Sequence, residues 1–144
     1  MKKLMIFPFV FLALLLCGCT VSLDPDLSKV DEFTEVAEEM DVVFTEAKST
    51  FMELDEQSSL SSNDQKTIEF QIKLLREAIN NFKSTEAPFL VKTAKKSAAK
   101  ELNKIDKKLI KFEEKAKNDE VKKGDLQSLI ELVTDDIEIN FWKK

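Results

Sequence analysis

The 144-residue chain contains no histidine and no tyrosine, and it holds only two cysteines, two glycines and three prolines. Histidine changes charge near neutral pH and is a common metal ligand, so its absence removes much of the usual acid–base and metal chemistry. A glycine-rich phosphate loop and a GxSxG nucleophile turn are also missing. We therefore expect a protein that is not an enzyme and that binds no metal and no dissociable cofactor.

Turn-forming residues are scarce as well. After residue 20 the chain has one glycine, Gly124, and two prolines, Pro25 and Pro88. A β-sandwich or a doubly wound α/β domain needs more turn residues than these. Glutamate, lysine, leucine and alanine, which favour helices, are abundant instead. An all-α fold is predicted.

The two cysteines, Cys17 and Cys19, directly follow an apolar stretch of 13 residues, Leu4 to Leu16. They suggest a redox pair, half a metal site, the end of a membrane span or a processing signal. A metal site would need further ligands, and the chain offers neither histidine nor a third cysteine. A spanning helix needs about 20 apolar residues. A secretory signal needs only about 7–15 after a basic start such as Lys2-Lys3. A processing signal is therefore favoured.

The segment Leu16-Cys17-Gly18-Cys19 resembles the lipobox of bacterial lipoproteins, in which a leucine and a small residue precede the lipid-modified cysteine. The resemblance implies that residues 1–18 are a signal peptide that is removed, and that a diacylglyceryl group is attached to the Cys19 thiol. It also implies a protein held at the extracytoplasmic face of the cell membrane, since two acyl chains suffice for stable anchoring. Cys17 would leave with the signal peptide, so no disulfide would form.

From Cys19 onward the chain carries 20 basic and 27 acidic side chains, and they are segregated along the sequence. Residues 24–57 hold 12 acids and two lysines, whereas residues 92–123 hold 12 lysines and six acids. The acidic total argues against a nucleic-acid partner. The separation of the two signs is the more informative feature.

Apolar residues recur at helical spacing in four segments that follow an expected tether, residues 19–28. We predict an antiparallel bundle of four amphipathic helices, two long and two shorter, within a domain of residues 29–144. The first and third helices are expected to have about 28–30 residues, or roughly 42–45 Å. A long helical hairpin with two shorter helices packed on it is the alternative architecture.

Local signals mark the helix ends. Ser62 followed by Gln65 predicts a capping box at the start of the second helix. Pro88 suits the first turn of the third helix. Gly124 is expected to end that segment, and Asp125 to cap the fourth helix.

The third segment carries lysines on the face opposite its apolar stripe. Such a face suits a polyanion, either a phospholipid surface or a wall polymer such as a teichoic acid, because each basic residue near an anionic surface contributes about 1 kcal/mol. The alternative is a solvated helix face that the acidic first helix partly neutralises. This lysine stripe consists of Lys96, Lys100, Lys104, Lys107, Lys111 and Lys115.

Several large apolar residues lie off the expected core stripes of the second and fourth helices. They predict a surface for a protein partner or for the membrane, unless these helices bury two sides. These residues are Phe70, Leu74, Leu132, Ile139 and Trp142.

The whole pattern resembles small lipoproteins of low-GC Gram-positive bacteria that are grouped as a domain of unknown function. The resemblance includes the lipobox, the long helices and a Phe-x3-Glu-x-Pro junction, here formed by Phe82, Glu86 and Pro88. A weaker resemblance is to cell-wall-binding lipoproteins, which are also helical and lysine-rich but longer. Neither implies catalytic residues. Neither supplies a mechanism either. We expect an interaction or structural module at the cell envelope, with an unknown protein or cell-wall partner.

Overall fold

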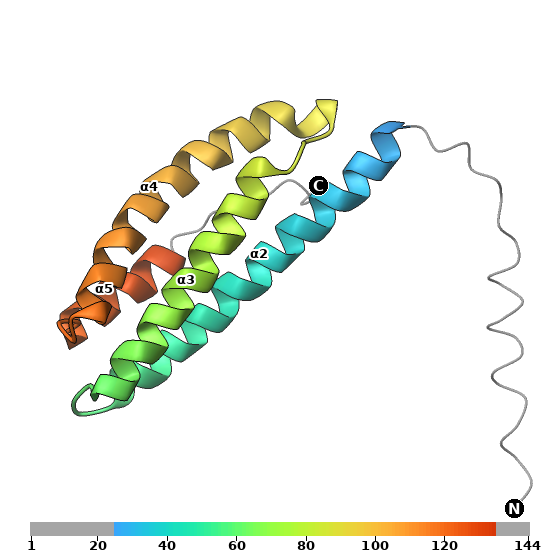
Figure 1. Cartoon of the computed structure of the whole chain (residues 1–144). Coiled ribbons are helices and arrows are strands. Elements are labelled where there is room, and N and C mark those ends of the chain that lie inside the picture. The colour runs from blue at the N-terminus through green and yellow to red at the C-terminus, as the bar shows by residue number, and fades with distance from the viewer. Residues whose placement is uncertain (1–24, 135–144) are drawn as a thin grey trace, which may run out of the picture.

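The computed structural model describes residues 25–134, which form four α-helices and one short 3₁₀ turn (Figure 1). No strand occurs within this range, so the predicted all-α bundle is confirmed. Cys19, Ile139 and Trp142 lie outside the described residues. The elements in chain order are α2 (Pro25–Glu56), α3 (Ser62–Ser84), η1 (Phe89–Val91), α4 (Lys92–Lys117) and α5 (Lys123–Thr134).

Consecutive helices run in opposite directions, as expected for an up-and-down bundle (Figure 1). Helix α3 packs against both α2 and α4, while α5 packs mainly against α2. The 32 residues of α2 extend about 48 Å and the 12 residues of α5 only about 18 Å at 1.5 Å per residue. Helix α5 therefore covers only part of the length of α2. Helix α2 begins four residues before the expected domain start at residue 29, which shortens the expected tether.

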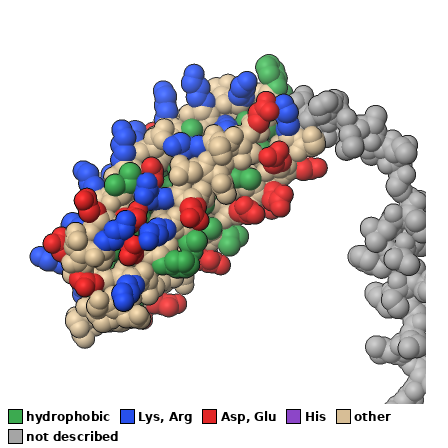
Figure 2. All heavy atoms as spheres, in the orientation of Figure 1, with side chains coloured by type: hydrophobic (Ala, Val, Ile, Leu, Met, Phe, Trp, Pro, Cys, Tyr) green, Lys and Arg blue, Asp and Glu red, His purple; other side chains and the backbone are tan. Residues whose placement is uncertain are grey.

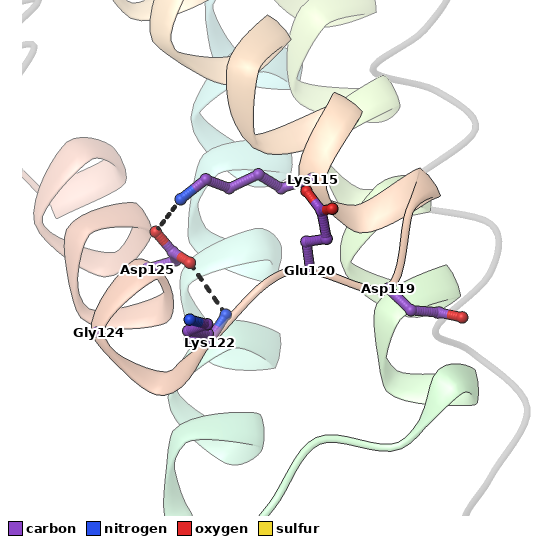
Figure 3. Close-up of a pocket in the computed structure, with 6 residues that line it drawn as sticks. All are labelled: Lys115, Asp119, Glu120, Lys122, Gly124 and Asp125. Atoms are coloured by element: carbon purple, nitrogen blue, oxygen red, sulfur yellow. Dashed lines mark hydrogen bonds and ion pairs between the residues drawn. The ribbon is translucent and has the colours of Figure 1, made fainter.

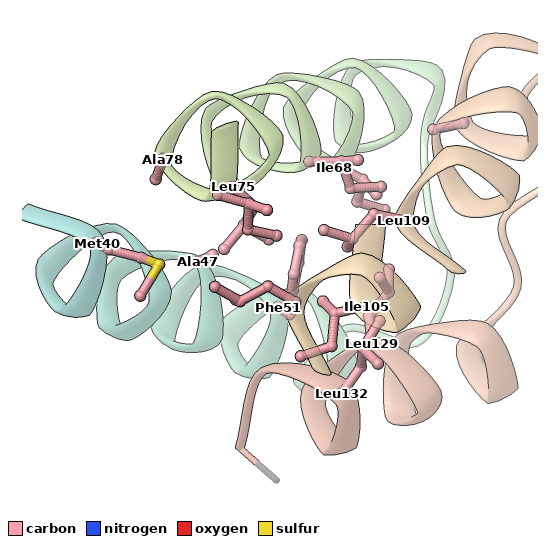
Figure 4. Packing of buried hydrophobic residues seen from close by; sticks show 14 of the residues in the cluster. Met40, Ala47, Phe51, Ile68, Leu75, Ala78, Ile105, Leu109, Leu129 and Leu132 are labelled. Carbon is pink, nitrogen blue, oxygen red and sulfur yellow. The ribbon is translucent and has the colours of Figure 1, made fainter. Parts of the chain in front are cut away.

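The core is formed by the apolar stripes of all four helices, which meet along the bundle axis (Figure 4). Phe33 of α2 and Phe82 of α3 are fully buried, and their ring centroids lie 5.4 Å apart. Phe51, Leu109 and Leu129 bring α2, α4 and α5 together near the other end. The 3-4 spacing predicted that these residues are buried, because it places them on one side of their helix, but it did not predict which of them meet.

The N-cap residue of α3 lies one residue before its predicted position, Ser62. Ser61 is the N-cap, and its hydroxyl accepts a hydrogen bond from the Asp64 amide, 3.2 Å. The Ser61 amide donates in return to Asp64 Oδ2, 2.7 Å, which completes the capping box. The predicted Ser62–Gln65 box is wrong because Asp64 takes the reciprocal role and Gln65 is buried among the helices.

The end of α4 also differs from the prediction. The helix ends at Lys117, because Asp119 adopts the left-handed conformation, φ 56°. The Glu120 amide donates to the Lys115 carbonyl, 2.8 Å, and the Asp119 amide donates to the Ala116 carbonyl, 3.2 Å. These two bonds form a Schellman motif in which aspartate takes the position usually held by glycine.

Gly124, expected to end the third helix, lies in the first turn of α5 instead. Helix α5 begins at Lys123, so Asp125 is not its cap residue. The carboxylate of Asp125 still supports the start of the helix, since it accepts from the Lys122 amide at 3.0 Å. It acts from inside the first turn, where an acidic side chain favours the positive end of the helix dipole.

Candidate functional site

The lysine stripe is displayed along the outer face of α4. Its first five members are exposed, whereas Lys115 is partly buried. Lys104 pairs with Glu101 at 2.8 Å, and both side chains remain mostly exposed. Among residues 25–134, no ion pair involves the other four exposed members, Lys96, Lys100, Lys107 and Lys111.

Acidic side chains gather on a different part of the surface, over α2, and the visible face of the molecule is divided between the two signs (Figure 2). Helix α3 lies between α2 and α4, and no ion pair joins α2 to α4 in the part of the chain that the structure describes. The first helix was expected to neutralise the lysine stripe in part, but within the described residues no ion pair joins the two. Two oppositely charged faces remain open to solvent.

Lys115 has a local structural role that separates it from the rest of the lysine stripe. Its ammonium lies 2.7 Å from Asp125 Oδ1 and 5.9 Å from the centre of the Phe112 ring. Burial alone would raise the pKa of Asp125, but the hydrogen bonds from Lys115 and from the Lys122 amide outweigh it and lower that pKa. Lys115 thus joins the end of α4 to the start of α5.

A depression of about 680 Å³ opens beside this ion pair, where α4 turns into α5. Figure 3 shows Lys115 and Asp125 pointing toward each other, with Glu120 close by and Asp119 directed away. The Ser62 hydroxyl of α3 donates to Asp119, 3.1 Å. Two lysines and three acidic residues line the depression. Lys115 and Asp125 already form an ion pair with each other. Its geometry is that of a helix connection rather than of a binding site.

The α3–α4 interface contains polar connections that the sequence did not predict. Arg76, the only arginine of the chain, donates to Asp106 at 2.9 Å and to Glu113 at 2.6 Å. Lys117 also donates to Glu113, 2.7 Å. Burial would raise the pKa of Glu113, whose side chain is 7% exposed, but the bonds from Lys117 and Arg76 outweigh it and lower that pKa.

Gln65 makes a second polar connection, from α3 to the segment between α4 and α5. Its side-chain amide donates to the Val121 carbonyl, 2.8 Å, and its side-chain carbonyl accepts from the Val121 amide, 3.2 Å. Gln65 thus satisfies both backbone groups of a buried residue in the α4–α5 connection. The signal in the sequence was a polar residue three positions before Ile68 on the apolar face of α3.

The predicted apolar surface is only partly present. Phe70 is 58% exposed and Leu74 is partly exposed, both on α3. Leu132 is buried, 8% exposed, so its assignment to an exposed surface is wrong. Helix α5 buries Leu132 together with Leu126 and Leu129, which follow one another at intervals of three residues and so share one face of the helix.

Among the described residues, no group of acidic or thiol side chains has the arrangement of a metal site, and no helix is long and apolar enough to cross a membrane. No protein-family model matches the chain, and no curated protein and no solved structure shows significant similarity to it. The fold defines a four-helix bundle with separate acidic and basic faces. Its function is inferred from these residues and this geometry.

Proposed function

We propose that this chain is a lipoprotein, anchored outside the cytoplasmic membrane by a diacylglyceryl group on Cys19, whose bundle is a non-catalytic interaction or structural module of the cell envelope. The observation that carries the proposal is the lipobox-like Leu16–Cys19 segment after a basic start and a short apolar stretch. Helix α2 begins at Pro25, six residues after Cys19. A folded bundle would thus stand close to the membrane on a short tether.

The anchor is tested by mass spectrometry of the protein from producing cells. The unmodified sequence should yield a chain that starts at Cys19 and carries an acyl mass. Cys19→Ser should abolish both the acyl mass and the cleavage, whereas the matched variant Cys17→Ser should be processed normally. Normal processing of Cys19→Ser would refute the assignment.

A second candidate function is the binding of anionic envelope polymers or lipid headgroups by the lysine stripe. The observation that favours it is the row of four exposed lysines without an ion-pair partner within residues 25–134. Binding of a teichoic acid should then weaken with salt and fall when Lys100, Lys104, Lys107 and Lys111 are changed to glutamate. If binding survives this charge reversal, the lysine stripe is not the polyanion-binding site. The interaction module then remains as the proposed function.

A protein partner is sought by cross-linking in cells. The exposed Phe70 offers a position for a photoreactive side chain, since it lies outside the core on α3. A cross-link from Phe70 that Phe70→Ser weakens would assign the partner surface to this face. Cross-links from the lysine stripe alone would assign it to α4.

A further inference from the structure

Residues 85–91 connect α3 to α4 and are called the α3–α4 turn. This turn displays the two most exposed large apolar side chains among the described residues. Phe89 is 81% exposed and Leu90 is 91% exposed. Their neighbours behave differently, because Pro88 is buried and both Ala87 and Val91 pack partly against the core. The turn is therefore attached to the bundle without using Phe89 or Leu90. Two adjacent large apolar residues that lie outside the core indicate a surface that contacts a membrane or another molecule.

Hydrogen bonds hold the turn in place. The Lys95 ammonium donates to the carbonyls of Lys83 and Thr85, and so caps the end of α3. The Thr85 amide and hydroxyl both donate to the Asn81 carbonyl, at 3.0 and 2.8 Å. The exposed pair thus sits on a fixed support, which lowers the entropic cost of presenting it to a partner.

The turn lies at the same end of the bundle as the start of α2. Lys29 of α2 pairs with Glu86 of the turn at 3.0 Å. Figure 1 shows the first residues of α2 and the α3–α4 connection at the same end of the bundle. Pro25 lies six positions after Cys19, and an extended chain over six positions reaches at most about 22 Å. A lipid on Cys19 would therefore keep this end, and not the opposite one, near the membrane.

The charges around the turn match an anionic surface. Residues 83–96 contain four lysines and one glutamate, Glu86, which is already paired with Lys29. Lys92 and Lys96 are exposed on the first turns of α4. In Figure 2, hydrophobic side chains protrude at this end of the molecule, and Lys and Arg side chains follow along the adjoining edge. Apolar side chains beside lysines are the combination that binds a bilayer interface.

We propose that the α3–α4 turn is a membrane-contact site, in which Phe89 and Leu90 enter the interfacial region of the bilayer and Lys92 and Lys96 face anionic headgroups. The inference rests on the proposed lipid anchor, which supplies the proximity. The site shares Lys96 with the lysine stripe, but it does not need the distal part of that stripe, because Lys107 lies about 16 Å beyond Lys96 along α4. That separation is about twice the Debye length of roughly 8 Å at physiological salt.

The experiment uses the lipidated protein reconstituted into vesicles of phosphatidylglycerol and phosphatidylcholine. Under the proposed processing, Leu90→Cys carries the only free thiol and is labelled with an environment-sensitive fluorophore. The matched control is Phe70→Cys, also an exposed apolar position, about 21 Å from the end of α3 at Ser84. We expect a quencher attached to lipid headgroups to quench the label at position 90, and aqueous iodide to quench the label at position 70.

The charges are tested in the same vesicles. Changing Lys92 and Lys96 to glutamate in the labelled Leu90→Cys protein should lower the ratio of docked to undocked protein by at least about fivefold per lysine, since each contributes about 1 kcal/mol. Changing Lys107 and Lys111 to glutamate should leave that ratio unchanged. A larger effect of the Lys107 and Lys111 changes than of the Lys92 and Lys96 changes would overturn the inference in favour of binding by the distal part of the lysine stripe.

Three other results would also overturn it. Equal access of iodide to the labels at positions 90 and 70 would show that the turn stays in water. Protection of the label at position 90 without lipids, rising with protein concentration, would show that a second copy covers the turn. An unacylated Cys19 in the mass spectrum would overturn both the anchor and this inference, whereas an acylated protein with an unquenched label would overturn the inference alone.

Discussion

The connection made by Arg76 supports a quantitative prediction for Arg76→Met. Methionine keeps most of the apolar stem but removes the guanidinium, which bonds Asp106 at 2.9 Å and Glu113 at 2.6 Å. The three side chains are 30%, 18% and 7% exposed, so solvent screens the pairs only in part. A hydrogen bond to a charged group contributes about 1.5–3 kcal/mol when buried. Reducing two such bonds by about half for partial exposure predicts a loss of about 2 kcal/mol.

Urea denaturation followed by circular dichroism measures this loss. In a separate thermal scan, the midpoint of unfolding of Arg76→Met should lie about 8 °C below that of the unmodified protein, since a domain of this size loses about 4 °C per kcal/mol. The control is Lys104→Met, which removes the exposed pair with Glu101, where the side chains are 69% and 60% exposed. That pair should contribute no more than about 0.5 kcal/mol. Equal effects of the two substitutions would refute the assigned role of Arg76.

The pH dependence provides an independent check. The folded state lowers the pKa of Glu113 from its ordinary value of 4.5; burial opposes this shift, and the bonds from Lys117 and Arg76 outweigh it. A lowered folded pKa means that the contribution of Glu113 to stability is complete above about pH 4.5 and is lost as the pH falls through the folded pKa. The difference between the unmodified protein and Arg76→Met should therefore shrink in acid. A difference that stays constant from neutral pH to pH 3 would contradict the linkage.

The remaining predictions concern single positions and can be measured by the same denaturation assay. Gln65→Ala should cost about 2–4 kcal/mol, because both backbone groups of Val121 lose their partners while buried; a cost below 1 kcal/mol would show that water replaces the amide. Gly124→Ala should stabilise α5 by about 0.5–1 kcal/mol, since no atom lies within 4 Å of the added methyl group, and a destabilised variant would mean that the helix starts later. Asp119→Gly should relieve the left-handed backbone but lose the bond from Ser62, so its net effect should stay within about 1 kcal/mol.

Much of the fold was predictable from residues that act locally. The helical spacing of apolar residues from Val30 to Leu54 and from Val91 to Ala116 predicted two long helices and most of their buried residues, because one face of a helix can reach the core only at that spacing. Ala94 of the second stripe is exposed instead. The scarcity of glycine and proline predicted few connections. Helix ends were less predictable. The same capping rules allow both the predicted box of Ser62 and Gln65 and the observed box of Ser61 and Asp64.

The candidate surfaces, too, were only partly predictable from the sequence. The exposure of the lysine stripe on α4 followed from the apolar stripe opposite to it. The burial of Leu132 did not follow, because α5 is short and its surroundings depend on how α2 passes beside it. Phe89 and Leu90 gave no helical signal, and a turn that follows a proline does not reveal which of its side chains face outward.

The sequence by itself determined the helical class, the number of helices, the separation of acidic and basic segments and the lipobox-like start, because each depends on residue type and spacing along one chain. Only the tertiary structure decided that α3 separates the acidic and basic helices, that Arg76 and Gln65 join α3 to the residues that follow it, and that the α3–α4 turn lies beside the start of α2. These facts depend on which helix packs against which. That choice is made by the fit of whole apolar faces in a close-packed core, which no local pattern encodes.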